Sequence, residues 1–164
     1  MFSRAMELRK SMNESSECTF QAMITADYGD VLYEFHMDCA VDSSGNVKFS
    51  VVSPESIAGI TGIITAEEAA ITFDDKVLAF PMLADAQITP VTAPWIFIRT
   101  LRGGFLTGCS KDNDYICLYL DDSYEEQALH LEIYADLSMV PQYVEVIWKD
   151  RHILTMRIKD FTIK

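Results

Sequence analysis

Strict alternation of apolar and polar side chains is the feature that most restricts how this chain can fold. In the clearest run, Leu129, Leu131 and Ile133 alternate with His130 and Glu132. Successive side chains of a strand point to opposite faces, so such a run predicts a strand with one buried and one exposed face. The fold must therefore contain a sheet that is covered on one side.

The same pattern recurs along most of the chain. Residues 17–26, 33–41 and 47–52 alternate in this way, with turn sequences at 27–30 and 42–46 between them, which predicts a three-stranded antiparallel meander. Further strands are expected at 61–65, 69–73, 76–80, 105–109, 115–121, 128–137, 143–148 and 153–163.

The period changes in two places, where helices are expected. Residues 1–14 place Met1, Ala5, Leu8 and Met12 on one stripe, which is typical of an amphipathic helix. The segment 90–102 opens with prolines, carries arginines near its end and stops at glycine, as helices do. A single helical turn is also expected at 53–59, which has proline near its start and glycine at its end.

About ten strands in one sheet cannot stay flat, because strand twist curls a large sheet. We therefore predict an α+β, mainly β protein: a large curled antiparallel sheet, or unclosed half-barrel, covered by two or three short helices. At 164 residues the chain is expected to be a single domain over 1–164. Its predicted parts are an N-terminal helix 1–14, sheet 17–88, a lid helix 90–102 and sheet 105–164.

Charge restricts the partners of the chain. The net charge of −12 disfavours nucleic acids and anionic membrane surfaces as direct partners. No stretch reaches the ~18 consecutive apolar residues of a membrane-spanning helix, and charges interrupt the first ten residues where a signal peptide would need an apolar run.

The four cysteines allow two interpretations. The midpoint of Cys18 and Cys39 and the midpoint of Cys109 and Cys117 both fall on turn sequences, so each pair could face across a hairpin and form a disulfide. The alternative, which we favour, is that all four are reduced, half-buried thiols.

Signals for catalysis or metal binding are weak. His36, His130 and His152 fall on separate strands or turns, the cysteines have no C-x-x-C spacing, and no Gly-x-Ser-x-Gly is present. We therefore expect a protein that is not an enzyme and has neither metal nor cofactor.

With this order of elements, two short stretches carry a family resemblance. Residues 49–62, where a strand runs into a proline and a glycine-rich turn, and Thr72-Phe73-Asp74-Asp75 resemble the LolA/LolB-like superfamily of periplasmic lipoprotein carriers, and most of all its uncharacterised bacterial lipoprotein relatives. The resemblance implies a half-barrel that binds acyl chains beneath its helices. Family carriers latch the lid with a buried arginine, which the sequence matches to no particular position.

The resemblance also implies a location. The relatives outside the carriers are often secreted and tethered by a lipid on an N-terminal cysteine, which would lie upstream of Met1. We therefore expect an extracytoplasmic, membrane-tethered protein, with a cytoplasmic location as the alternative.

The candidate binding residues are apolar. They belong to the expected lid helix or to the inward faces of the strands, and they are Trp95, Ile96, Phe97, Ile98, Phe20, Phe35, Met37, Phe49, Ile133 and Trp148. The leading hypothesis is a non-enzymatic cell-envelope module that binds an acyl chain, a lipid or an acylated protein. The alternative is an envelope protein-interaction or sensor domain in which the lid segment simply fills the core.

Overall fold

The computed structural model describes residues 1–65 and 90–164. In chain order its elements are α1 (Phe2–Glu14), β1 (Glu17–Asp27), β2 (Leu32–Asp42), β3 (Val47–Ser53), β4 (Thr61–Ile64), a short 3-10 turn (Pro90–Thr92), α2 (Ala93–Gly103), β5 (Phe105–Asp112), β6 (Tyr115–Asp121), β7 (His130–Ala135), β8 (Pro141–Trp148) and β9 (Arg151–Ile163).

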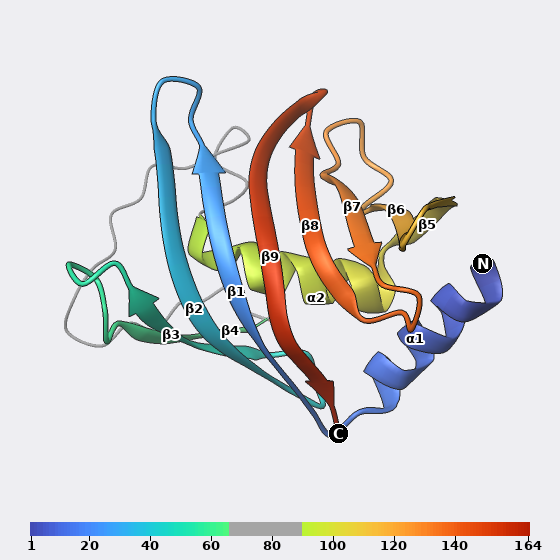
Figure 1. Cartoon of the computed structure of the whole chain (residues 1–164), viewed down its shortest axis with the longest axis horizontal. Helices are drawn as coiled ribbons and strands as arrows, with labels where there is room; N and C mark the ends of the chain where they lie inside the picture. Colours follow the sequence, from blue (N-terminus) through green and yellow to red (C-terminus); the bar gives the residue numbers. More distant parts are fainter. Residues whose placement is uncertain (66–89) are drawn as a thin grey trace.

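The described strands form one sheet of nine, in the order β4-β3-β2-β1-β9-β8-β7-β6-β5. Every neighbouring pair is antiparallel. The long final strand β9 pairs with both β1 and β8 and so joins the N-terminal meander to the C-terminal strands. In Figure 1 the sheet curls without closing, and α2 crosses one side of it. We call this side the inner face and the opposite side the outer face.

The alternation in the sequence is the reason for this arrangement. In β1 the buried side chains are Cys18, Phe20, Ala22, Ile24 and Ala26, and they alternate with more exposed ones throughout the strand. The predicted fold class and the 17–52 meander are therefore confirmed. The strands expected at 69–73 and 76–80, and the sheet boundary at 88, lie outside the described residues.

The helical turn expected at 53–59 is wrong. Residues 54–59 form successive turns, in which Ile57 N–H donates to the Pro54 carbonyl (3.1 Å) and Ala58 N–H donates to the Glu55 carbonyl (3.3 Å). These bonds span three residues rather than the four of an α-helix. The segment is a turn between β3 and β4.

The two long helices form as expected. The buried side of α1 consists of Ala5, Leu8 and Met12, as the predicted stripe requires. At the end of α2 the backbone at Gly104 lies close to two carbonyl groups. A Cβ on Gly104 would lie 2.7 Å from the Thr100 carbonyl oxygen and 2.9 Å from the Asp121 carbonyl oxygen. Only glycine fits where the chain leaves α2 and enters β5.

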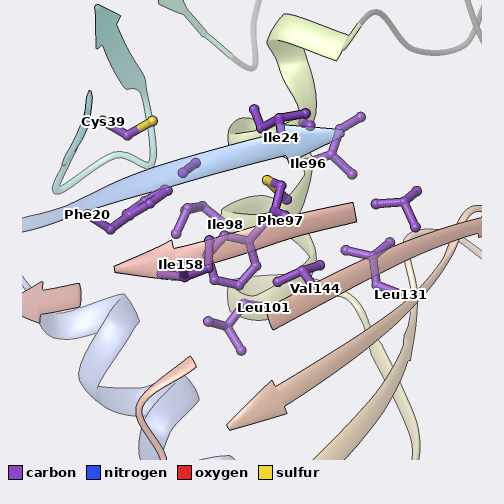
Figure 2. Close-up of a cluster of buried hydrophobic side chains, with 14 of the residues drawn as sticks. Phe20, Ile24, Cys39, Ile96, Phe97, Ile98, Leu101, Leu131, Val144 and Ile158 are labelled. Atoms are coloured by element: carbon purple, nitrogen blue, oxygen red, sulfur yellow. The ribbon is translucent and has the colours of Figure 1, made fainter. Parts of the chain in front are cut away.

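The core lies between α2 and the inner face. Figure 2 shows Phe97, Ile98 and Leu101 of α2 among side chains of β1, β8 and β9. Phe97 is fully buried and meets Phe20 of β1 edge to face, with ring centroids 5.7 Å apart. The helix thus supplies the apolar cover that a curled sheet with one apolar face needs.

We expect Phe97→Ala to lower the free energy of unfolding by about 3–5 kcal/mol, because it leaves a large cavity between α2 and β1. Urea denaturation monitored by circular dichroism measures this. The matched control is Val52→Ala, which truncates a half-exposed β3 side chain and should change stability by less than about 0.5 kcal/mol. Equal losses in both variants would contradict the packing described here.

Candidate functional site

The structure brings the ten predicted binding residues together on the inner side of the sheet. Eight are buried, and Trp95 and Trp148 are partly buried against the same core cluster. Their role as ligand contacts stays a prediction. The indole Nε1 of Trp148 is buried and has no hydrogen-bond partner among the described residues, and the Nζ of Lys149 lies 4.5 Å from the ring centroid of Trp148.

The side chains of α2 fill the space that a ligand of the inner face would need. Ile96, Phe97, Ile98 and Leu101 are each at most 3% exposed. Both sides of this contact are apolar, so dispersion and the hydrophobic effect hold the middle of α2 against the sheet.

Polar contacts hold the C-terminal end of α2 instead. Arg9 of α1 donates from Nε to the Leu101 carbonyl (2.9 Å) and from one terminal nitrogen to the Gly104 and Thr100 carbonyls (2.6 and 3.5 Å). A helix leaves its last carbonyls without partners and carries partial negative charge there, so a guanidinium satisfies both needs. Burial lowers the pKa of Arg9 from its usual value.

Two further side chains, Asn13 and Arg102, extend the contact that Arg9 makes. We call these three residues together the latch. Asn13 donates from Nδ2 to the Arg102 carbonyl (3.1 Å) and accepts at Oδ1 from Arg102 Nε (3.2 Å). Arg102 also donates to the Ser43 carbonyl in the β2–β3 turn (2.9 Å). The latch therefore ties α2 to α1 and to the far part of the sheet at one point.

An ion pair lies along the exposed side of α2. Arg99 pairs with Asp122 at 3.0 Å, and its guanidinium carbon lies 4.5 Å from the ring centroid of Trp95. The fluorescence emission of Trp95 should therefore depend both on the position of α2 and on the guanidinium charge of Arg99.

A cleft of about 370 Å³ opens between α1 and the inner face, and we call it the α1 cleft. Its lining is apolar toward the sheet and polar toward α1, and it consists of Arg4, Glu7, Leu8, Ser11, Ser138, Met139, Val140, Phe161 and Ile163. Phe161 also packs against Phe20 and Phe97, with ring centroids 5.9 and 6.4 Å apart. The cleft therefore reaches the aromatic part of the core.

A second hollow, of about 930 Å³, lies on the outer face and is called the outer groove. Its side chains come from β1 to β4, with Asp160 of β9 at the border, and they include Thr19, Gln21, Asp38, Ala40, Lys48, Ser50, Thr61 and Ile63. These residues alternate with the buried Phe20, Cys39 and Phe49, so they point away from α2. The groove is more polar than the space beneath α2.

The cysteine pairing predicted from turn midpoints is wrong. In β1 and β2, Cys18 lies opposite Val41 and Phe20 lies opposite Cys39, so the two thiols are diagonal neighbours rather than directly opposed. In β5 and β6, Cys109 lies opposite Leu118, and this one-residue offset places Cys109 and Cys117 on opposite faces. All four cysteines are free, but only Cys109 is half-buried, whereas Cys18, Cys39 and Cys117 are buried.

The buried thiols are in environments that disfavour the thiolate. Burial, and secondarily the charge of Glu17, raises the pKa of Cys18 to about 12. Burial also raises the pKa of Cys39, with smaller contributions from Asp38 and Cys18. These two cysteines act as small apolar side chains of the core.

The outer face of β7, β8 and β9 carries a network of tyrosines, acids and one histidine. Tyr134 donates to Glu132 (2.8 Å), Tyr143 donates to Glu145 (3.2 Å), and Nδ1 of His152 lies 2.8 Å from Glu145. Burial and the bond to Glu132 raise the pKa of Tyr134. Within residues 1–65 and 90–164, no group of three or more histidine, cysteine or acidic side chains is placed to hold a metal ion.

None of the helices in the described part of the chain is long and apolar enough to span a membrane.

The sequence matches no protein-family model and no curated protein. Solved structures with a similar fold include an uncharacterized conserved protein from Thermus thermophilus, at 11% identity and a TM-score of 0.49 over 100% of this chain and 88% of that one. They also include a LolA superfamily protein from Nitrosomonas europaea, at 8% identity and a TM-score of 0.43 over 98% and 93% of the two chains. A third is the lipoprotein LppX of Mycobacterium tuberculosis, at 8% identity and a TM-score of 0.44 over 97% and 93%.

These similarities concern the arrangement of helices and strands. At such low identity no residue of the site is carried over from them.

Sequence reasoning missed the latch and the α1 cleft. Arg9 lies beside the buried stripe of α1, on the side that meets α2, and this position was the one available signal. The cleft joins residues of α1 to residues 138–163, which are more than 120 positions away. No local pattern could have predicted that contact.

We expect Arg9→Met to destabilise the protein by about 1–3 kcal/mol, because it leaves carbonyls at the end of α2 without a donor. The methionine keeps most of the apolar stem. Lys10→Met is the matched control, since Lys10 is exposed and, within the described part of the chain, its one ion pair is with Glu14 at 3.9 Å. If the two variants have equal denaturation midpoints, the latch does not contribute to stability and this prediction is wrong.

Thiol accessibility tests the cysteine environments. When the native protein is treated with iodoacetamide, we expect Cys109, which is only half-buried, to react first, and Cys18 and Cys39 to react slowly because the thiolate is the nucleophile. Peptide mass spectrometry measures the rates, and protein unfolded in urea provides the control. A native Cys18–Cys39 disulfide would contradict the strand register.

Proposed function

We propose that the protein is a non-catalytic binding module for a single apolar chain, the acyl chain of a lipid or of an acylated protein. In this proposal the chain passes through the α1 cleft and takes the place of α2 side chains against the inner face. The observation that carries the proposal is the division of contacts along α2: apolar side chains in its middle and a polar latch at its C-terminal end. A helix held in this way can leave the sheet by pivoting about the latch.

The α1 cleft supports the choice of ligand. Its volume of about 370 Å³ is near the lower end of the ~300–1,000 Å³ found for small-molecule sites, which suits one slender chain. Phe161, Leu8 and Ile163 offer an apolar wall, and Arg4 and Ser11 at the helix side offer donors for a polar head group.

The energetics agree with such a ligand. Each buried methylene contributes about 0.8 kcal/mol, so ten methylenes supply roughly 8 kcal/mol, which corresponds to about micromolar affinity before ordering costs. Moving α2 away from the sheet lowers this affinity, because only the fraction of molecules with α2 displaced can bind.

Within this proposal the protein works in the cell envelope, tethered by a lipid, as the family resemblance of its sequence implies. Acylated proteins and free lipids are both ligands of the proposed kind. Both ligands contain an acyl chain, and they differ in the group to which that chain is attached.

A second candidate function is favoured by one observation. Ile96, Phe97, Ile98 and Leu101 fill the inner face, so the same fold can serve as a protein-interaction or sensor domain with a permanent core. In that case α2 is structural and no lipid binds.

The two functions are separated by titrating a Trp148→Phe variant, in which Trp95 is the sole tryptophan, with a long-chain fatty acid or a lysophospholipid below its micelle concentration. The acyl-chain function predicts a shift in Trp95 emission and a higher melting temperature, because α2 moves and the ligand binds the folded state.

The control is the same titration with a short-chain acid of equal charge, which should leave the emission unchanged. If neither long-chain ligand changes the emission or the melting temperature, and mass spectrometry of the purified protein detects no lipid, the filled-core interaction domain is the correct function.

A further inference from the structure

The sheet of described strands ends at β5, which pairs with β6 alone. The strand at the other end, β4, has four residues, whereas β5 has eight. Alternate N–H and C=O groups of an end strand point away from its neighbour and find no partner within the sheet. Outside the ladder with β6, no backbone hydrogen bond among the described residues involves residues 105–112.

Part of β5 is regular enough to accept another strand. The ladder between β5 and β6 shifts register between Leu106 and Gly108, and from Gly108 to Asp112 it continues without a further shift. A bulge and an edge lysine, here Lys111, are features that suppress indiscriminate pairing between sheets. They leave five consecutive residues whose free side can pair with a matching chain.

The N-terminal half of α1 lies alongside β5. Arg9 donates to the carbonyl of Gly104 (2.6 Å), the residue immediately before β5. Burial raises the pKa of Cys109, and the positive charge of the chain's amino terminus opposes this effect, which places that terminus near Cys109. In Figure 1 the N-terminal end of α1 and β5 lie at the same border of the molecule.

Two apolar side chains of α1 lie on the side that faces the end of α2 and β5. Successive residues of an α-helix are about 100° apart, so Phe2 and Met6 lie within about 60° of Arg9 around α1. Their side chains are 53% and 50% exposed. Leu106 and Cys109 of β5 are partly buried against the core cluster. We call the free side of Gly108–Asp112, together with Phe2 and Met6, the β5 edge.

The charge near the β5 edge distinguishes between possible occupants. Residues 105–148 include nine acidic residues and one basic residue, Lys111. A second copy of the chain would bring the same excess of negative charge, and like charges oppose association. A partner that carries lysine or arginine is attracted instead.

We propose that the β5 edge binds an extended segment of a partner polypeptide, which adds a strand to the sheet. A polypeptide backbone supplies alternating donors and acceptors at the spacing that a strand requires. In such complexes the main chain gives affinity and alternate side chains give specificity. Here apolar side chains of the partner would contact Phe2 and Met6, and its cations would face the acids of 105–148. Neither Phe2 nor Met6, nor any residue of β5, lines the α1 cleft, so this site is separate from the acyl-chain site.

Peptide binding tests the inference. The probe is a fluorescein-labelled heptapeptide with blocked ends, Lys-Val-Thr-Val-Thr-Val-Lys, and fluorescence anisotropy measures its affinity for the full chain. We expect saturable binding that is about tenfold weaker when both lysines are replaced by glutamate, because the acidic residues then repel the peptide. Methylating the backbone nitrogens of two adjacent central residues, one on each side of the peptide strand, should abolish binding, since strand addition requires these donors.

Protein variants and NMR locate the bound peptide. In titrations of isotope-labelled protein we expect amide shifts in residues 108–112 and in the first two turns of α1. The double variant Phe2→Ser/Met6→Ser should weaken binding about tenfold, because it removes apolar contact area. The matched control is Leu32→Ser, which removes a 61% exposed side chain at the β1–β2 turn and should leave the affinity unchanged. Circular dichroism confirms that both variants fold.

The inference is overturned if no peptide binds, if methylated and unmethylated peptides bind equally, or if the lysine and glutamate peptides bind equally. Shifts confined to other strands would overturn it as well. Analytical ultracentrifugation covers the remaining occupant: a dimer that Phe2→Ser/Met6→Ser dissociates would show that a second copy occupies the edge and would contradict the proposal. Loss of peptide binding leaves the Trp95 response to lysophospholipid intact, so the two proposals fail independently.

Discussion

The contact between the apolar side of α2 and the inner face of the sheet is the interaction on which the rest of the structure depends. A nine-stranded curled sheet has a large apolar face, and no other described helix crosses it. Without Phe97, Ile98 and Leu101 in place, the inner side chains of β1, β8 and β9 would face water. The sheet and the helix therefore stabilise each other, and the α1 cleft exists only because α1 packs beside them.

The same contact is the physical basis of the reversible binding that we propose. Apolar packing depends on buried area rather than on specific partners, so another apolar chain can take the place of α2 at modest cost. The specific contacts lie at one end of α2, where Arg9, Asn13 and Arg102 satisfy carbonyls and join the helix to α1 and to the β2–β3 turn. One end of the helix is thus fixed by hydrogen bonds, whereas its middle is held by packing against the sheet and, on its exposed side, by the Arg99–Asp122 ion pair.

Much of the fold could be predicted from sequence, because alternation and helical stripes are local properties. The β7 pattern at Leu131 and Ile133 and the α1 stripe at Ala5, Leu8 and Met12 both describe the structure correctly. Strand register was less accessible, because turn geometry sets it. The turn centred between Asn113 and Asp114 places Cys109 opposite Leu118, which moves one thiol to the other face.

The candidate site was predictable in part, for the same reason. The apolar residues of α2 are predictable because they form a consecutive hydrophobic run in the sequence. The latch, in contrast, depends on hydrogen bonds from Arg9 to carbonyls about 90 positions further along the chain. Tertiary contacts between side chains and distant backbone leave no periodic signal. The α1 cleft, formed by three separate segments, is inaccessible to sequence reasoning on the same grounds.

The central claim is that α2 fills the inner face as a displaceable element. Hydrogen exchange of the backbone amides, followed by mass spectrometry with and without lysophospholipid, tests this most directly. The account predicts that peptides from residues 93–103 exchange faster than those from β1 and β9, and that ligand changes the exchange of α2 and of the cleft residues but not of the sheet. If α2 exchanges as slowly as the central strands and does not respond to ligand, α2 is a permanent part of the core and the account is wrong.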